Sequence, residues 1–427
     1  MSLLDELTAE ELAARFRQST PEALPEGWEN HSKVFEAHQI LADESLGKLP
    51  PIPEFERSRG IVVCAGGHGL FTNAWVCLRM LRHFDCRLPV QFWYLGEQEM
   101  DGTMRRLVAN HGAECVDARE VAQEHPVRTL NGFELKPFAI IQSPFREVML
   151  LDADNVPIRD PTYLFLTVEF QQHGAIFWPD FHRLEPFRGI WEACQVEYRD
   201  EPEFESGQIV VDKARCWEAL NVTMHYNEHS DFYYRHIHGD KDTFHLAFLR
   251  TGKSFAMPSR GIDALDATMC QHDFDGNRVF QHRNMDKWML DGTNRKIDDF
   301  LHEDLCREYL AELREQWSGT VHWNATPTPI EHAVINELAD KTYRYTRVGY
   351  DARLVELRRD RTIAEGANRC ERLWTVTLDE GRLSLVLLGD EGATCLLVPN
   401  GTTWQGRWLH HERMPVVLEA IEAHRSR

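Results

Sequence analysis

The amino-acid sequence predicts an α/β protein in which a mixed, mainly parallel sheet is flanked by helices and followed by a small C-terminal β-rich module. Three observations lead to this prediction. Short apolar runs alternate with helical patterns between about residues 60 and 250, as in the strand–helix–strand units of parallel sheets. Residues 148–151 form a continuous apolar run, which is typical of a strand buried on both faces. After about residue 346 the pattern changes to short β-like runs separated by glycines.

Four regions are predicted along the 427 residues: an N-terminal helical appendage (1–54), a central α/β domain (55–297), a helical connector (298–345) and the C-terminal β-rich module (346–427). In the appendage, Thr8 and Glu11 have the spacing of a capping box, which predicts a helix that runs through Phe16.

The elements of the later regions follow from hydrophobic periodicity. We expect strands at 60–65, 90–95, 115–116, 148–151, 174–178 and 208–211. Helices are expected at 73–84, 100–110, 136–143 and 241–249, with a charged helical pattern over 298–340. The C-terminal module is expected to contain strands at 373–378, 383–388 and 394–398 and a final helix at 415–424.

Composition excludes several classes of function. Lys plus Arg number 47 and Asp plus Glu number 68, so the net charge is −21, which argues against nucleic acid as a partner. No run approaches the roughly 18 apolar residues of a membrane span. The N-terminus lacks a signal-peptide pattern, and the cysteines Cys64, Cys77 and Cys395 lie within apolar runs. We therefore expect a cytoplasmic protein with no membrane span.

The strand at 148–151 runs directly into Asp152 and Asp154, with only Ala153 between them. Unpaired carboxylates are costly to bury, and a divalent cation at the carboxyl end of the sheet would remove that cost. Ligands of open α/β sheets bind at this edge, and Mg²⁺ is commonly held by carboxylates together with substrate phosphates. The pattern predicts an enzyme that binds a phosphate-bearing substrate through a metal.

Two phosphate chemistries use such a pair of aspartates. A haloacid-dehalogenase-like phosphatase would use Asp152 as its nucleophile, with Asp240 and Asp242 as a later acidic motif. A GT-A glycosyltransferase would use Asp152 and Asp154 to hold a metal on a nucleotide-sugar diphosphate. The phosphatase motif normally lies in the first strand of its domain, whereas a strand–helix–strand–helix unit precedes it here, which favours the transferase. A sugar-binding scaffold without turnover is the non-enzymatic alternative.

A series of motifs between about residues 59 and 285 resembles one family. They are Arg59-Gly-Ile-Val-Val63, Leu135-Lys-Pro-Phe-Ala-Ile140, the stretch 148–157 with Asp160-Pro161 and Leu164-Phe165, Phe177-Trp-Pro-Asp180, Glu205-Ser-Gly-Gln208, Gly239-Asp-Lys-Asp-Thr-Phe244 and Phe280-Gln-His-Arg283. Their order resembles that of the fungal Golgi α-mannosyltransferases that build mannan side chains, which are retaining enzymes of the GT-A type. The sequence is similar, more distantly, to glycogenin-type glucosyltransferases. Members of the fungal family are membrane-anchored, and this sequence shows no anchor.

The resemblance implies a GT-A, Rossmann-like catalytic domain over 55–297 that binds a nucleotide sugar. It implies Asp152, Asp154 and His282 as ligands of Mn²⁺ or Mg²⁺, and imidazole is a common ligand of such metals. Other donor contacts are expected at Ala65, Gly66, Gly67, Lys136, Ala153, Ser206 and Gly207. Catalytic roles are expected for Glu205, Gln208, Asp180 and Asp242.

Several of these residues also have ordinary structural interpretations. The glycines after the first strand are equally consistent with a tight turn, and Glu205–Gln208 is expected just before a strand, where a turn is common. Asp242 lies where a helix N-cap is expected, so capping competes with sugar binding.

GDP-mannose is the expected donor and a UDP-sugar the alternative, with a glycan or another hydroxyl-bearing molecule as acceptor. The C-terminal module is expected either to position the acceptor or to mediate a homo-oligomer.

Overall fold

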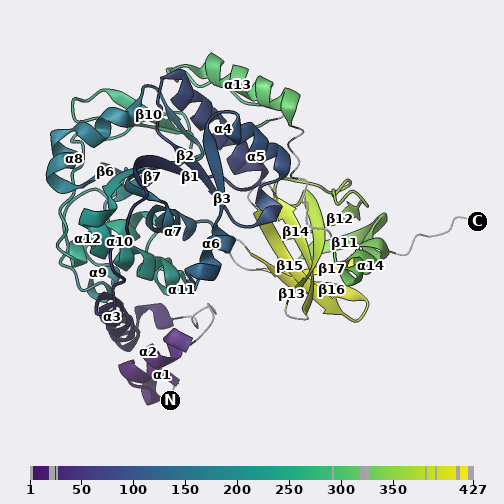
Figure 1. Ribbon diagram of the computed structural model, residues 1–427. Helices are drawn as coiled ribbons and strands as arrows, with labels where there is room; N and C mark the ends of the chain where they lie inside the picture. The colour runs from purple at the N-terminus through teal and green to yellow at the C-terminus, as the bar shows by residue number, and fades with distance from the viewer. Residues whose placement is uncertain are drawn as a thin grey trace, which may run out of the picture. The chain divides into compact units, whose positions relative to one another are not determined.

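The computed structural model describes residues 3–18, 25, 27–290, 293–317, 319, 321, 327–379, 382–389, 392–409 and 414–421. The chain divides into two compact units (Figure 1). The first unit comprises Met1–Ala65, Thr72–Gly96 and Arg105–Ser318, and the second comprises Gly66–Phe71, Glu97–Met104 and Gly319–Arg427. Each unit is described separately.

The first unit is built on a six-stranded mixed sheet with the order β3-β2-β1-β4-β7-β6. Its strands are β1 (Arg57–Cys64), β2 (Val90–Tyr94), β3 (Ala113–Asp117), β4 (Phe145–Asp152), β6 (Ala175–Pro179) and β7 (Phe204–Asp212). The pairs from β3 to β4 are parallel, while β7 runs antiparallel to both β4 and β6. This confirms the predicted α/β class with a mixed, mainly parallel sheet.

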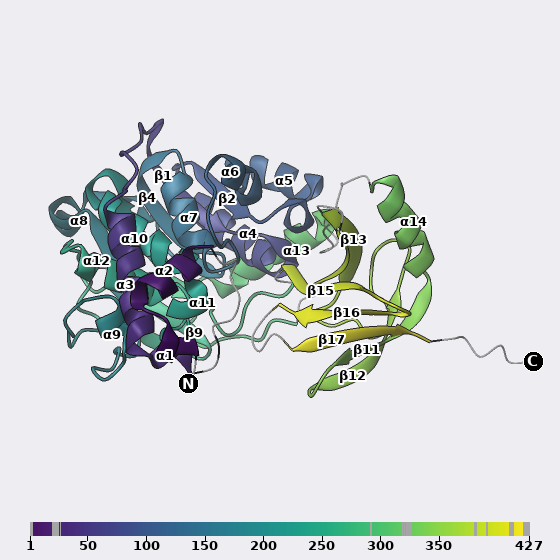
Figure 2. The ribbon, with the colours of Figure 1, turned by 90° about the horizontal axis from the view of Figure 1, so that it is seen from below.

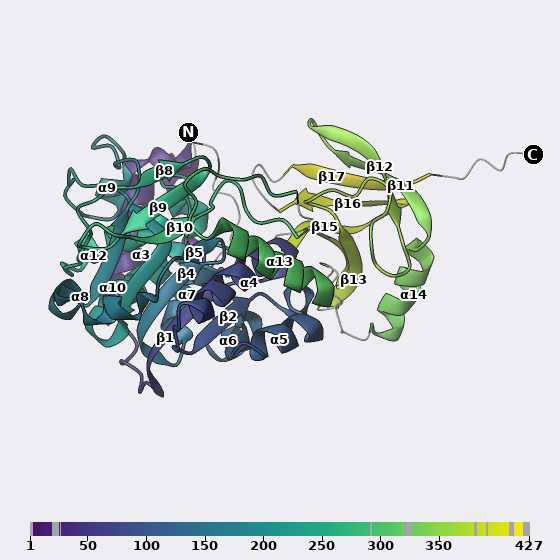
Figure 3. The ribbon, with the colours of Figure 1, turned by 90° about the horizontal axis from the view of Figure 1, so that it is seen from above.

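A second, antiparallel sheet in the first unit has the order β5-β10-β9-β8. Its strands are β5 (Asn155–Pro157), β8 (Asp263–Leu265), β9 (Thr268–His272) and β10 (Arg278–His282), and Figure 3 shows them side by side. Strand β5 follows β4 after a two-residue turn. The second sheet therefore begins where the first sheet places its two aspartates.

The α-helices that precede residue 317 pack either on the main sheet or on other helices. Those of the N-terminal half are α1 (Leu3–Glu6), α2 (Ala9–Gln18), α3 (Ser32–Leu46), α4 (Gly67–His83), α5 (Gly102–Ala109), α6 (Ala118–Glu124) and α7 (Leu135–Gln142). Those that follow are α8 (Val168–His173), α9 (Ile190–Ala193), α10 (Lys213–Glu228), α11 (Ser230–Tyr233), α12 (Lys241–Arg250) and α13 (Glu303–Gln316). Short 3₁₀ helices lie at Trp28–Asn30, Glu97–Glu99 and Pro161–Leu166.

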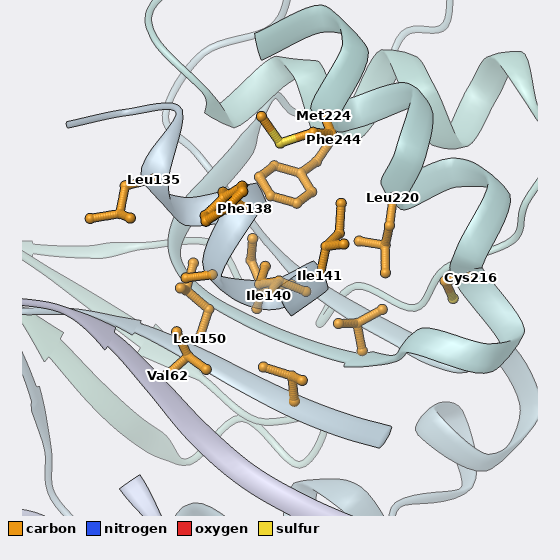
Figure 4. Close-up of a cluster of buried hydrophobic side chains, with 14 of the residues drawn as sticks. Val62, Leu135, Phe138, Ile140, Ile141, Leu150, Cys216, Leu220, Met224 and Phe244 are labelled. Carbon is orange, nitrogen blue, oxygen red and sulfur yellow. The ribbon is translucent and has the colours of Figure 1, made fainter. Parts of the chain in front are cut away.

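One core of the first unit lies between the sheet and α7, α10 and α12. Phe138 and Ile140 of α7 pack against Val62 and Leu150 of the sheet, and Leu220 of α10 covers them (Figure 4). All five side chains are buried. Burial of this size stabilises the domain by roughly 1.5–3 kcal/mol per large apolar side chain, and it fixes α7, which supplies Lys136 to the site.

The N-terminal helices belong to the first unit and pack on its other helices. The capping box of α2 forms as predicted, because the Thr8 N–H donates to the Glu11 carboxylate (2.8 Å) and the Glu11 N–H donates to Thr8 Oγ1 (3.2 Å). Helix α3 lies against α9 and α10 (Figure 2). Val34 and Leu41 share a buried cluster with Trp191.

The second unit contains a seven-stranded antiparallel sheet with the order β12-β11-β17-β16-β15-β14-β13. Its strands are β11 (Lys341–Arg347), β12 (Asp351–Leu357), β13 (Leu373–Asp379), β14 (Arg382–Gly389), β15 (Gly392–Asn400), β16 (Thr403–Trp408) and β17 (Pro415–Ala420). Helix α14 (Pro329–Leu338) precedes them. Residues 362 and 363 bridge the two edge strands β12 and β13. This unit confirms the predicted β-rich module, and its sheet begins at Lys341.

Three local predictions were wrong. The segment predicted as a helix from 415 is strand β17, because it pairs with both β11 and β16 and such pairing overrides weak local preference; its predicted end at residue 424 lies outside the described residues. Glu205–Gln208 lies within β7 rather than before a strand. The N-cap position of α12 is occupied by Asp240, so Asp242 is not the N-cap but the second residue of the helix.

Among the described residues, none of the helices has the length and apolar character that a membrane crossing requires. The cysteines Cys64, Cys77 and Cys395 are buried and take part in no disulfide, as predicted for core residues.

Candidate active site

Strand register brings three distant segments to one edge of the main sheet. Asp152 ends β4, and Leu151 pairs with Gln208 in the antiparallel neighbour β7. The beginning of β7 therefore lies beside the end of β4. In the second sheet His282 pairs with Asn155, which places the end of β10 next to the two aspartates.

Asp152, Asp154 and His282 form the group with metal-binding potential among the described residues. One ligand atom from each lies within 4.8 Å of the others. His282 Nε2 is 3.2 Å from Asp154 Oδ1 and 3.8 Å from Asp152 Oδ2. Two carboxylates and an imidazole are a donor set suited to Mn²⁺ or Mg²⁺, so these residues fit the predicted ion.

The pKa values of Asp154 and His282 are set mainly by the charged groups that surround them in this site, which oppose the effect of burial. Burial alone would lower the pKa of His282, but Asp154 and Glu205 raise it to about 10. Burial would raise the pKa of Asp154, but His282 and Lys287 hold it well below its usual value. The carboxylate of Asp154 is therefore ionised, as a metal ligand must be.

Two lysines supply positive charge to this acidic group. Lys136 Nζ lies 2.8 Å from Asp152 Oδ1 and 3.5 Å from Asp240 Oδ1. Lys287 Nζ forms an ion pair with Asp154 Oδ2. Sequence reasoning found Lys136 and missed Lys287. The signal that was available is its position five residues after His282, directly before the buried Trp288.

Glu205 and Gly207 hold His282 from the other side. His282 Nδ1 is 3.3 Å from Glu205 Oε1, and the same carboxylate oxygen accepts a 2.9 Å hydrogen bond from the Gly207 N–H. A Cβ atom at residue 207 would lie 2.6 Å from His282 Nδ1 and 2.8 Å from Glu205 Oε1. Only glycine fits there without moving the histidine or the carboxylate.

Gln208 and Asn155 hold Glu205 and Gly207 in place. Gln208 Nε2 donates to Glu205 Oε2, and Asn155 Nδ2 donates to the Gly207 carbonyl (2.9 Å) and to Gln208 Oε1 (2.8 Å). Both side chains are fully buried. The amide of Gln208 is therefore committed to holding Glu205, and its predicted contact with a sugar stays a prediction.

The other residues predicted to contact the nucleotide sugar lie in several different elements. Ser206 Oγ accepts from Lys136 Nζ at 3.2 Å, and Ala153 is buried in the turn between the aspartates. Ala65 follows β1 and donates its N–H to the Trp93 carbonyl. Gly66 and Gly67 belong to the second unit, where a Cβ at residue 66 would collide with the Glu99 side chain and Gly67 has φ +75°. Both therefore require glycine for local reasons.

Asp180 and Asp242 gather around Lys241 rather than around His282. Lys241 Nζ lies 2.5 Å from Asp180 Oδ2 and 4.0 Å from Asp242 Oδ2. Burial raises the pKa of Asp242 to about 8, although Lys241 opposes the shift, and the nearby Glu203 adds to it. Their predicted catalytic roles stay predictions.

In sequence, this chain is similar to mannosyltransferases. A family model described as "Mannosyltransferase putative" matches residues 58–190 and 194–282, which is more than half of the chain. The α-1,2-mannosyltransferase MNN24 of Candida albicans is 27% identical over 259 residues, covering 50% of this chain and 36% of that protein. MNN5 of Saccharomyces cerevisiae, also an α-1,2-mannosyltransferase, is 26% identical over 312 residues, covering 58% of this chain and 53% of that protein. This chain thus spans about half, or less, of the length of these relatives.

Solved structures that are similar include core-mannan synthase A of Aspergillus fumigatus in its Mn/GDP form. It is 7% identical, with a TM-score of 0.33, and covers 47% of this chain and 72% of that one. The bifunctional glycosyltransferase WbbM is 12% identical, with a TM-score of 0.37, and covers 52% of this chain and 46% of that one.

Proposed function

This chain belongs to the mannosyltransferase family, and on that premise we propose that it is a metal-dependent enzyme that transfers mannose from GDP-mannose to a hydroxyl group. The observation that supports the metal dependence is the convergence of Asp152 at the end of β4, Asp154 in the turn that follows it, and His282 at the end of β10. A UDP-sugar is the alternative donor. The acceptor is proposed to be a glycan or another hydroxyl-bearing molecule.

Local charge explains how an acidic protein can bind an anionic donor. The net charge of −21 repels a nucleotide diphosphate at long range. At the site, however, Lys136 and Lys287 present ammonium groups next to the carboxylates. We propose that these two lysines contact the diphosphate oxygens once the aspartates hold a metal.

Asp152, Asp154 and His282 would hold the Mn²⁺ or Mg²⁺ ion. When bound, such an ion stabilises the negative charge that develops on the departing nucleotide. Glu205 keeps His282 oriented through Nδ1 and leaves Nε2 facing the aspartates. A carboxylate beside the second ring nitrogen commonly fixes the ring position of a ligating histidine.

The phosphatase interpretation loses support because the chain belongs to a transferase family. Both oxygens of Asp152 lie within 3 Å of Lys136 Nζ, a pairing that is compatible with either chemistry and does not distinguish them.

Asp154→Asn tests the proposal directly, because it keeps the shape of the side chain and removes its charge. We expect at least a ~100-fold loss of Mn²⁺-dependent sugar release from GDP-mannose, which is the size of effect that loss of one charge-stabilising group produces. The measurement is nucleotide release with GDP-mannose and UDP-sugars, with and without EDTA. Asp200→Asn, whose side chain is 75% exposed, is the control and should match the wild type. Turnover that survives EDTA would contradict metal dependence.

The acceptor is best found by mass spectrometry of products formed from labelled donor and a panel of glycans. The cytoplasmic location and the homo-oligomer expected from the sequence stay predictions. The first calls for localisation of the tagged chain in its source cells, and the second for size-exclusion chromatography with light scattering.

A further inference from the structure

A buried lysine far from the metal-binding triad has no acidic partner. Lys213 follows β7 directly, is the first residue of α10 and is fully buried. Among the described residues its ammonium group forms no ion pair with a carboxylate, and the neighbouring Asp212 pairs with Arg146 instead (3.3 Å). Burial lowers the pKa of Lys213 to about 7. A buried charge without a counter-ion is costly, so this position needs an explanation.

The acceptors of Lys213 are the last polar groups of helix α7. Its Nζ donates to the carbonyl oxygens of Ile141 (3.0 Å) and Ser143 (2.6 Å), and Ser143 Oγ lies 3.4 Å away. The carbonyls at a helix C-terminus lack partners within the helix and carry the negative end of its dipole. Lys213 therefore holds the end of α7 and the connection 143–144 that joins α7 to β4.

Lys136 binds the same three elements at their other end. It is the second residue of α7. Its Nζ lies 2.8 Å from Asp152 Oδ1, at the end of β4, and 3.2 Å from Ser206 Oγ, near the beginning of β7. Strand β7 runs antiparallel to β4, so the end of β7 that precedes Lys213 lies beside the start of β4. The two lysines thus connect α7, β4 and β7 at opposite ends.

Apolar packing alone does not fix the position of α7 along its own axis. Phe138 and Ile140 hold the helix on the sheet, but the hydrophobic effect is non-directional. Hydrogen bonds to individual carbonyl oxygens are directional. Because Lys136 and the carbonyl of Ile141 belong to one helix of eight residues, a shift of its C-terminal end would also move Lys136.

We propose that Lys213 is a positioning residue for the transfer reaction, which holds the C-terminal end of α7 and so keeps Lys136 at Asp152 and Ser206. The importance of this contact for the reaction rests on the proposed function, in which Lys136 binds the diphosphate. The effect of Lys213 on Lys136 does not rest on it, so the two can be tested separately.

Lys213→Met tests the effect on Lys136 without any ligand, because methionine fills similar space and cannot donate to the carbonyls. The rate at which acetic anhydride acylates Lys136, followed by mass spectrometry, should rise at least threefold as its ion pair with Asp152 loosens. Lys241, whose Nζ lies 2.5 Å from Asp180 Oδ2, should react as in the wild type. Lys48→Met, at a side chain that is 75% exposed, is the control and should change neither rate.

A double-mutant cycle then tests the link to the reaction. Calorimetry with Mn²⁺ and GDP should show at least a fivefold loss of affinity for Lys213→Met alone. In a Lys136→Met background the same substitution should cost less than twofold, because residues that act through one another are not additive. If the wild type binds no GDP while acylation of Lys136 still rises in the variant, the proposed function fails and the effect on Lys136 stands.

Three results would overturn the positioning role. They are an unchanged acylation rate of Lys136 in folded Lys213→Met, an equal rise at Lys241, which would show general loosening, and a GDP affinity that is unchanged or falls equally in both backgrounds. If Lys213→Met does not fold by circular dichroism, Lys213→Gln takes its place, since its shorter amide can still donate to one carbonyl. The same changes are then expected at about half the size.

Discussion

At the scale of single residues, the site depends on one position that has no side chain. Gly207 leaves room for His282 and Glu205, which approach it from opposite sides. A sequence shows that a glycine is present but not which atoms need its space. The same holds for Lys287, whose partner Asp154 is 133 residues away along the chain.

Gly207→Ala should therefore weaken metal binding without unfolding the protein. The added methyl group would lie 2.6 Å from His282 Nδ1, so the ring or Glu205 must move. We expect at least a ~10-fold loss in the Mn²⁺-dependent affinity for GDP, in line with the effect of disturbing the residues that orient metal ligands. Isothermal titration calorimetry measures it.

Gly261→Ala is the matched control, because no atom lies within 4 Å of a Cβ built there. It should bind Mn²⁺ and GDP like the wild type. An unchanged affinity in Gly207→Ala would show that His282 is free to shift without loss of the ion.

Two of the predicted site residues carry a local signal in the sequence, and the roles of all of them stay predictions. Asp152 and Asp154 end a buried strand, and a buried charge at that point demands an explanation. His282 was placed by resemblance alone, since only the pairing of β10 with β5 brings it to the aspartates. The pairing of Lys241 gave no signal, because its carboxylate partners Asp180 and Glu203 lie directly after β6 and directly before β7, far from it in the sequence.

At the scale of elements, most strands were predictable because continuous apolar runs are buried on both faces. Strand β4 follows this rule from Val148 to Leu151. Strand β17 does not, because its residues are buried in alternation and its identity depends on pairing with β11 and β16. The antiparallel direction of β7 could not be predicted either, because the local sequence pattern carries no information about strand direction.

Helix α3 is attached to the first unit through a buried histidine. The ring of His38 stacks on Phe232 at 3.8 Å and lies 5.5 Å from the His229 ring. Neither ring nitrogen has a hydrogen-bond partner among the described residues. Burial holds the pKa of His38 well below its usual value, and His229, His225, Arg128 and His236 act in the same direction.

The packing of α3 on the rest of the first unit should weaken in acid. A histidine kept neutral in the folded state takes up its proton only on unfolding, so stability is lost as the pH falls below the unfolded pKa of about 6.5. The pKa of His229 is lowered to about 3, chiefly by burial and then by Arg128. The free energy of unfolding that His229 contributes is therefore lost progressively until the pH reaches that value. At pH 5 each such histidine lowers the free energy of unfolding by about 2 kcal/mol.

His38→Phe should remove one such contribution while keeping the stack on Phe232. Its free energy of unfolding should fall less than that of the wild type between pH 7.5 and pH 5, by about 2 kcal/mol. Urea unfolding at both pH values measures this difference. His125→Phe, at an exposed position outside the buried cluster, serves as control. Parallel pH dependences of His38→Phe and the wild type would contradict the assignment.

At the scale of the whole molecule, the two units have separate hydrophobic cores. Trp374, Tyr345 and Leu418 lie in the core of the second unit, whereas the predicted metal ligands all lie in the first. The family model ends at residue 282, so it does not extend into the seven-stranded sheet of the second unit. The change of sequence pattern near residue 346 was enough to predict that sheet, but no motif in it indicates a function.

Trp374→Ala should destabilise the second unit alone. Trp374 is fully buried, and replacing a buried Trp by Ala typically costs about 3–5 kcal/mol. We expect faster hydrogen exchange in peptides from β13, β14 and β15, with unchanged protection of β4 and β7. Hydrogen-exchange mass spectrometry measures both sets in one experiment. Equal loss of protection in β4 would show that the units unfold together.

The pairing of β7 between two antiparallel neighbours restricts where the chain can change in length. Adding one residue within 204–208 would turn Glu205 toward the opposite side of the sheet and bring Phe204 or Ser206 into its place. Insertions and deletions that leave the enzyme working should therefore be confined to connections such as 181–202, which joins β6 to β7. A grafted loop that is meant to change the proposed acceptor should therefore replace part of this same connection.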